Sequence, residues 1–271
     1  MEKIRVLGSF MNQAGIVQFL WGNPHVAALF DELGLEPGRG YFVLRAAPMG
    51  TPRPELVGNA FGFFPPKMVA KLVARDWAAR SPDEVLAVAV PRLEEAARSV
   101  FEGVEGVPEL AAWCARAREQ ARCEGRMLAT AWSTVEFDEA DPHAALFFHG
   151  TVLREHRGDG HLLAVQHHGL TCLEALVLSN ARRGKDPTKV ATTRGWRPEE
   201  VAQALDSLAA RDALDGASIT EAGVELWEAV EATTDHLAAH AWDGLDVDEV
   251  LRLAEGVFAA ARLDGQLPPG A

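Results

Sequence analysis

The densest group of reactive side chains in this chain lies between residues 143 and 168, which hold six of its nine histidines. The centre of the group is the run 154–161, Arg-Glu-His-Arg-Gly-Asp-Gly-His. Imidazoles and carboxylates packed so closely can tune one another's protonation near neutral pH. This segment is therefore the first candidate for acid/base chemistry or for ligand capture.

Helical spacing decides which of these side chains could meet. His149 and His156 are seven residues apart, so on a continuous helix they lie within about 20° of one face. Asp159 follows His156 by three residues and can share that face. His161 falls off the face unless the helix bends, and the glycines on both sides of Asp159 favour a bend. A bent helix would bring His156, Asp159 and His161 together.

Three interpretations of this convergence stay open. The first is a structural network in which the arginines of the run pair with its carboxylates and with the N-terminal domain. The second is an acid/base or ligand-binding site, where a carboxylate fixes the tautomer of an imidazole and an arginine holds an anionic group. The third is a divalent metal site, but the spacing matches no familiar ligand set, so we expect no metal. His236 and His240, four residues apart, are interpreted as a solvated helix face.

A second candidate region runs from Arg45 to Lys67, where aromatic rings adjoin turns rich in Pro and Gly. Ligand cavities are mostly apolar with a few polar groups, and Phe61, Phe63 and Phe64 would suit such a wall. The same rings could simply fill the core. Arg45 is a lone arginine among apolar neighbours, so it either reaches water or binds an anion or carboxylate.

The elements that must position these residues are mainly helices. Ser81, Asp141 and Asp186 each precede a proline, a combination that marks helix starts, and Arg197-Pro198 opens a helix whose first turn is acidic. Strand signals are confined to Tyr41–Leu44 and to 214–219, which includes the turn pair Asp-Gly.

The polar, acidic tract 137–141 is the most plausible domain boundary. We therefore predict a helical domain over residues 1–138 and a winged helix-turn-helix domain over residues 139–271. Three helices, a hairpin and a terminal helix follow one another in the second part, which is the order of that motif. Its wing is very short, and long helices flank it.

The second domain resembles a known group. From Gly169 to about His236 the chain has Gly-Leu-Thr before a helix, a candidate recognition helix over 201–214, and Ile-Thr-Glu-Ala-Gly after a minimal wing. This stretch resembles the MarR group of winged-helix regulators. The whole chain resembles more closely an actinobacterial helix-turn-helix family with an N-terminal helical domain. The matching features are residues 45–48, 81–84, 154–161 and 193–196.

What the resemblance implies is a homodimer with a ligand site near the winged domain. DNA binding itself is disfavoured by charge, although not excluded. Residues 197–215 hold two arginines and five carboxylates, a net charge of −3, and the wing offers no Arg or Lys to the minor groove. A basic patch remains beside this stretch: Arg182, Arg183, Lys185, Lys189 and Arg194.

The composition is typical of a folded protein, which we expect to be cytoplasmic. The formal net charge of −13 argues against a main role in holding polyphosphate. No apolar run approaches the roughly 18 residues needed to span a bilayer, so we expect no association with a membrane. The three cysteines form no C-x-x-C pair and are interpreted as structural thiols.

These observations predict a winged-helix protein diverted from DNA to a small polar or anionic organic molecule, bound between the two domains. His156 would be the acid/base group, and Asp159 or Glu155 would orient it. The ligand would be held by Arg45, Phe64, His149, Arg154, Arg157 and His161. Any reaction would be non-redox and free of cofactors, and the actinobacterial resemblance suggests specialised metabolism. The alternatives are a ligand-responsive transcription regulator and a protein that sequesters a metabolite unchanged.

Overall fold

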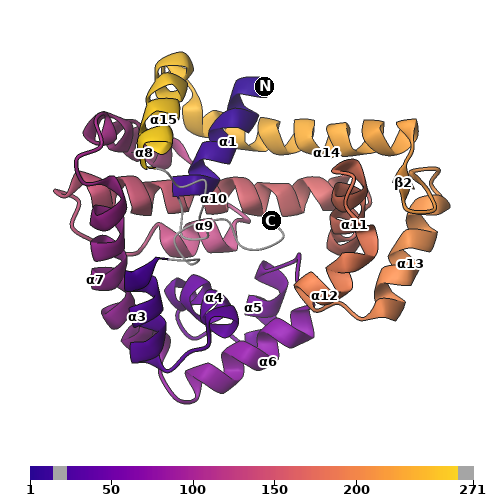
Figure 1. Cartoon of the computed structure of the whole chain (residues 1–271), viewed down its shortest axis with the longest axis horizontal. Coiled ribbons are helices and arrows are strands. Elements are labelled where there is room, and N and C mark those ends of the chain that lie inside the picture. Colours follow the sequence, from indigo (N-terminus) through magenta and orange to yellow (C-terminus); the bar gives the residue numbers. More distant parts are fainter. Residues whose placement is uncertain (15–22, 262–271) are drawn as a thin grey trace.

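One long helix, α10 (Pro142–His167), crosses the middle of the protein (Figure 1). It begins where the Asp141 carboxylate accepts the His143 N–H at 3.0 Å and Pro142 takes the first helical position. It ends before Gly169, whose φ of 67° only glycine adopts readily. Residues 144–153 are buried without interruption, so the first half of α10 is enclosed on all sides.

The computed structural model describes residues 1–14 and 23–261 and shows a mainly helical protein. The helices before α10 form an N-terminal layer around it (Figure 1). They are α1 (Glu2–Ala14), α3 (Pro24–Leu33), α4 (Pro37–Ala46), η1 (Ala47–Met49), α5 (Pro54–Ala60), α6 (Pro66–Trp77), α7 (Pro82–Phe101), α8 (Val107–Gln120) and α9 (Met127–Trp132).

The predicted winged helix-turn-helix follows α10 directly. Its elements are α11 (Cys172–Arg182), η2 (Pro187–Lys189), α12 (Val190–Arg194), α13 (Pro198–Ala209), β1 (Leu214–Asp215), β2 (Ser218–Ile219) and α14 (Glu221–Ala239). The two strands pair antiparallel, with Leu214 opposite Ile219. The chain then returns to the N-terminal layer through η3 (His240–Trp242) and α15 (Val247–Ala261), which packs on α1 and α8.

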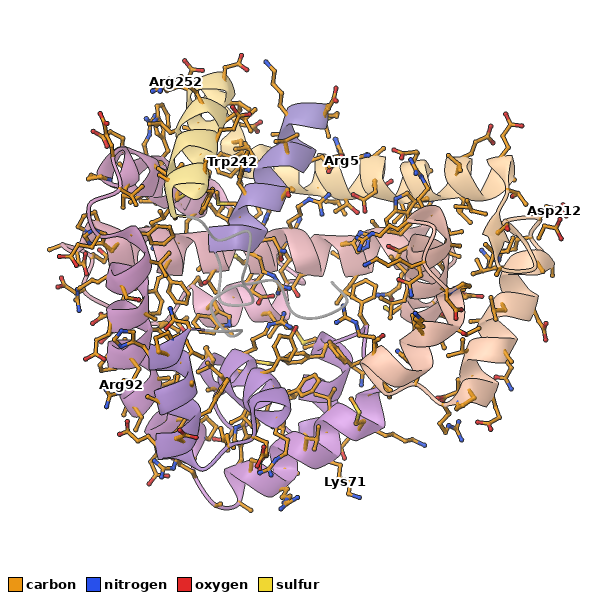
Figure 2. All side chains as sticks on the ribbon, viewed as in Figure 1. Arg5, Lys71, Arg92, Asp212, Trp242 and Arg252 are labelled. Atoms are coloured by element: carbon orange, nitrogen blue, oxygen red, sulfur yellow. The ribbon has the colours of Figure 1, made fainter. Side chains whose placement is uncertain are left out.

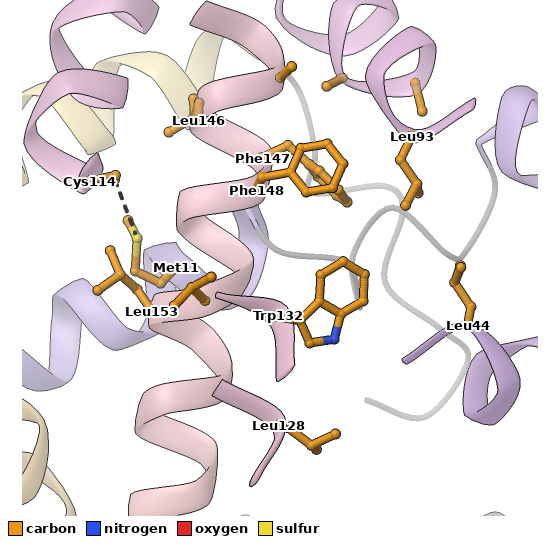
Figure 3. Close-up of a cluster of buried hydrophobic side chains, with 14 of the residues drawn as sticks. Met11, Leu44, Leu93, Cys114, Leu128, Trp132, Leu146, Phe147, Phe148 and Leu153 are labelled. Atoms are coloured by element: carbon orange, nitrogen blue, oxygen red, sulfur yellow. Dashed lines mark hydrogen bonds between the residues drawn. The ribbon is translucent and has the colours of Figure 1, made fainter. Parts of the chain in front are cut away.

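Two hydrophobic clusters stabilise this arrangement. The first joins the N-terminal layer, the first half of α10 and α15, and its centre contains Trp132, Phe147 and Phe148 (Figure 3). The second joins α11, α12, α13, the hairpin and α14, and it receives Ala164 and Val165 from the far end of α10. The division between the clusters therefore falls within α10 and does not coincide with the predicted boundary at residue 138.

Two local expectations were wrong. Residues 41–44 were considered for a strand, but they lie within α4, where Tyr41, Val43 and Leu44 are buried. The predicted bend of the histidine helix is also absent, because α10 is helical through Gly158 and Gly160. A Cβ on Gly160 would stand 2.5 Å from Nη1 of Arg126, so this glycine makes room for a crossing arginine.

Within the described ranges no single helix is long and apolar enough to cross a membrane. Helices α10 and α11 pass that test of length and composition only as a pair, and they meet at an angle of 99°.

The contact between α14 and the hairpin can be tested at Gly223. A Cβ there would stand 2.1 Å from the Ala213 carbonyl oxygen and 2.8 Å from Cγ1 of Ile219. Since the nearest atom belongs to the backbone, the hairpin must move. We expect Gly223→Ala to lower the free energy of unfolding by about 2 kcal/mol, measured by urea denaturation followed by circular dichroism.

The matched control is Gly256→Ala in α15, where no atom would lie within 4 Å of the new Cβ. This change should raise the free energy of unfolding by about 0.5 to 1 kcal/mol, because alanine favours a helix interior. Similar effects of the two substitutions would contradict the close packing of the hairpin on α14.

Candidate functional site

A cavity of about 710 Å³ lies between the N-terminal layer and the helix-turn-helix. Its wall is formed by residues of α1, α4, the α5–α6 turn, α9, α10, α11, α12 and α14. Pockets that hold small organic molecules measure roughly 300 to 1,000 Å³. The cavity is therefore large enough for such a molecule.

One carboxylate and two arginines form the inner wall. Glu155 is buried and accepts hydrogen bonds from Arg45 Nη2 at 2.7 Å and Nε at 3.0 Å. Arg154 Nη1 donates to the same carboxylate at 2.7 Å. Burial opposes ionisation of Glu155, but the two guanidinium groups outweigh it and hold its pKa below the usual value. This trio keeps its charges and carries one net positive charge into the cavity wall.

Aromatic rings hold Arg45 in place. Its guanidinium carbon lies 4.6 Å from the centre of the Phe61 ring and 5.0 Å from that of Tyr41, whose hydroxyl accepts a hydrogen bond from Nη1. The indole N–H of Trp132 donates to the Arg45 carbonyl oxygen at 3.1 Å. Arg45 therefore pairs with a buried carboxylate, the second of the two outcomes considered for it from the sequence.

At another part of the wall, α14 supplies carboxylates that pair with three arginines. Arg157 Nη2 donates to Glu231 at 2.9 Å and to Asp235 at 2.8 Å. Arg5 of α1 donates to Asp235 and to Glu228, each at 2.9 Å. Arg182 Nη2 also lies 3.8 Å from Glu228. Three carboxylates therefore face three guanidinium groups here, so this part of the wall has no surplus of positive charge.

The helix-turn-helix contributes arginines without such partners. Within the described residues, neither Arg183 nor Arg194 has a carboxylate within ion-pair distance. The Arg194 guanidinium lies 4.9 Å from the centre of the Phe64 ring. Burial lowers the pKa of Arg194, and the positive charges of Arg154, Arg45 and Arg183 lower it further. These cations are close enough to repel one another across the cavity.

Asp159 is a buried carboxylic acid at the cavity wall. Its Oδ2 accepts the backbone N–H groups of Leu128 at 2.9 Å and Ala129 at 3.0 Å, at the start of α9. Burial raises its pKa to about 6, although those hydrogen bonds favour the ionised form. This carboxyl group could exchange a proton with a bound molecule near neutral pH.

His161 also lines the cavity, beside an aromatic surface. It stacks on Phe63 with ring centres 5.5 Å apart and meets the edge of Trp227 at 6.1 Å. Its Nδ1 lies 2.8 Å from the Thr234 hydroxyl. Burial lowers its pKa, so a neutral ring faces the cavity.

His156 and His149 do share a face of α10, but that face packs against α8 and the segments around it. His156 Nε2 lies 3.1 Å from the Arg122 carbonyl oxygen, and its ring meets the edge of His240 at 5.0 Å. His149 contacts the Phe137 ring. Neither residue belongs to the cavity wall. The expected convergence of His156 with Asp159 and His161 is therefore absent.

Arg126 explains why the buried face of α10 tolerates polar groups. Its guanidinium crosses α10 at Gly160, donates to the His156 carbonyl oxygen and donates to the Leu237 carbonyl oxygen at 2.7 Å. His240, expected on a solvated face, instead accepts the Arg122 N–H at 2.8 Å. These contacts join α9, α10 and α14 and describe a structural network.

Of the residues expected to bind the ligand, the cavity wall contains Arg45, Phe64, Arg154, Arg157 and His161, together with Glu155 and Asp159 from the expected acid/base set. Three members of the basic patch, Arg182, Arg183 and Arg194, also line it. Arg5, Tyr41 and Trp227 were missed. No local motif marks them, because they reach the cavity from helices far apart in the sequence.

The surface of α13 carries little positive charge. Its exposed polar residues are Glu199, Gln203 and Asp206, and Arg197 is paired with Glu200 at 2.9 Å. The described part of the chain also contains no group of three or more His, Cys, Asp or Glu side chains placed to hold a metal ion.

The order of helices and hairpin after α10 defines a helix-turn-helix protein with a minimal wing. The chain belongs to the helix-turn-helix family, which matches residues 13–268. Comparisons with curated proteins and with solved structures found no match.

The structural role of His156 predicts a pH dependence. Burial lowers its pKa to about 3, and Arg126 and His240 add to this shift. Below about pH 6.5 the histidine of the unfolded chain binds a proton, whereas the buried histidine of the folded chain stays neutral. Acidification therefore favours unfolding. His156→Gln should therefore lose less stability than the wild type between about pH 6.5 and 4.5, where one such group contributes up to about 1.4 kcal/mol per pH unit.

Urea denaturation across this pH range measures the effect. His236→Gln is the control for the substitution itself, because His236 is exposed on α14. Identical profiles for His156→Gln and the wild type would mean that His156 ionises freely in the folded protein.

Proposed function

We propose that this helix-turn-helix protein binds a small anionic organic molecule in the cavity between its N-terminal layer and the helix-turn-helix. The observation that supports this most strongly is the charge of the wall: seven arginines line it, and the carboxylates that line it or pair with those arginines number five, Glu155, Asp159, Glu228, Glu231 and Asp235. The arginines are Arg5, Arg45, Arg154, Arg157, Arg182, Arg183 and Arg194. The whole chain has the opposite sign, with a formal net charge of −13.

Arginine suits this role because its planar guanidinium presents donors in a fork that matches carboxylate and phosphate oxygens. A cavity with low-dielectric walls strengthens such contacts relative to open solvent. Unfilled, the same wall holds mutually repelling cations, so an anion that enters relieves that repulsion.

The bound molecule would touch the helix-turn-helix itself. Leu176 and Ser179 of α11 and Arg194 of α12 line the cavity, and the Trp196 indole N–H donates to the Phe63 carbonyl oxygen at 3.3 Å. Contact between a ligand and these helices supports the MarR-like arrangement expected from the sequence, in which the ligand site adjoins the winged domain.

We attach no reaction to this binding. Among the described residues that line the cavity, the hydroxyls of Ser9, Tyr41 and Ser179 have no hydrogen bond to a histidine. If the molecule is changed, Asp159 and His161 are the titratable groups placed to exchange a proton with it. Mass analysis of the ligand before and after incubation separates conversion from sequestration.

Calorimetry tests the binding of aryl carboxylates, sulfonates and phosphates, each compared with the corresponding neutral alcohol. At least one anion should bind saturably and more tightly than its neutral counterpart. Arg154→Gln should weaken that binding by about tenfold, the value of one charge-assisted hydrogen bond. Ser179→Trp should obstruct the cavity and abolish the binding.

The control is Arg252→Gln. Arg252 lies on α15, away from the cavity, and pairs with Glu249 at the surface (Figure 2). Binding that survives both Arg154→Gln and Ser179→Trp would place the ligand elsewhere, and a complete lack of saturable binding would refute the proposal.

A ligand-responsive transcription regulator is the second candidate, favoured by membership of the helix-turn-helix family. The acidic surface of α13 opposes it, since DNA affinity depends on phosphate contacts that release counterions. We expect no sequence-dependent gel shift with the DNA upstream of the protein's own gene at about 150 mM salt. A saturable, sequence-dependent shift that weakens steeply with salt would establish the regulator instead.

A further inference from the structure

The cavity wall has two electrostatically different parts, and the difference narrows the ligand class. Beside α14, the carboxylates of Glu231 and Asp235 pair with Arg157, and Asp235 pairs also with Arg5. That part has no spare cation. Any anion must therefore bind nearer α11 and α12.

The other part has four arginines: Arg45 of α4, Arg154 of α10, Arg183 at the C-terminal cap of α11 and Arg194 of α12. Two carboxylates, Glu155 and Asp159, lie among them. The excess is two positive charges. Arg45 and Arg154 are occupied by Glu155. Arg154 Nε donates to Asn12 at 3.3 Å, so among the described residues Arg183, Arg194 and Nη2 of Arg154 are left to meet a ligand.

The cavity wall also carries an apolar surface. Phe63, Leu162 and Trp227 line the cavity with the neutral His161 ring among them. At about 710 Å³ the cavity is far larger than an inorganic anion needs. The ligand must therefore combine a flat apolar body with a compact anionic group.

From these observations we infer that the ligand is an organic phosphate, with its phosphate held by Arg154, Arg183 and Arg194 and its apolar part against Phe63 and Trp227. The inference rests on the proposed function and specifies its ligand. A phosphate monoester carries a charge of about −1.5 to −2 on one centre with three acceptor oxygens. One such centre can meet donors from three helices at once, whereas a monocarboxylate supplies half the charge and two oxygens.

Calorimetry in Tris chloride tests this inference on the full chain with four probes: 1-naphthyl phosphate, 1-naphthoate, naphthalene-1,8-dicarboxylate and inorganic phosphate. The naphthyl phosphate should bind at least about tenfold more tightly than each of the others. Relative to 1-naphthoate, its affinity should fall between about pH 7.5 and 5.5, because the second phosphate pKa is about 6, whereas protonation of Asp159, whose pKa burial raises to about 6, acts on both anions. Binding of the monocarboxylate should change less over this range.

Arg194→Gln and Arg183→Gln should each weaken the binding of 1-naphthyl phosphate by about tenfold. Each should also reduce the ratio of its affinity to that of 1-naphthoate. Arg252→Gln should leave all affinities unchanged, and circular dichroism checks that each variant is folded. Equal or tighter binding of either carboxylate, or full affinity for the phosphate in both cavity variants, would overturn the phosphate assignment while leaving anion binding intact. If none of the four probes binds, the proposed function and this inference fail together.

Discussion

The buried contact of Arg45 and Arg154 with the Glu155 carboxylate is the interaction on which the site depends. It ties α4 of the N-terminal layer to the central helix α10 over a separation of 110 residues. Two charges leave water for such a contact, and the loss of one partner from a buried pair typically costs about 3 to 5 kcal/mol. The second arginine keeps the trio cationic, so the contact both fixes the cavity wall and sets its sign.

The cavity wall and the chain as a whole carry charges of opposite sign. The chain is strongly acidic, and much of that acidity lies on outer surfaces such as α13. Arginines from helices distant in sequence instead converge on the cavity, where aromatic rings reduce their access to water. The α13 surface of the helix-turn-helix is thus acidic, whereas the side that lines the cavity carries Arg183 and Arg194. This arrangement favours a small anion inside over a nucleic acid outside.

The sequence predicted much of the fold, because helix caps and prolines are local signals. Asp141-Pro142 and Thr220 begin helices as expected, and the short wing forms where Asp215-Gly216 indicates it. It also placed Arg45 and the run 154–161 at one site. It could not decide which side of α10 would face the cavity, because residues 144–153 are buried all round and no polar face orients the helix. His156 was therefore assigned chemistry, although its face is covered.

Arginine side-chain NMR gives the most direct test that the unpaired cations of the helix-turn-helix bind an anion. In uniformly ¹⁵N-labelled protein, the Nε–Hε signals of Arg183 and Arg194 are followed during titration with 1-naphthyl phosphate, each assigned by its Gln variant. We expect saturable shifts at these two arginines and little change at Arg5, which pairs with carboxylates of α14 (Figure 2). Unchanged signals at both, or equal shifts at Arg5 and Arg252, would contradict anion binding at these arginines.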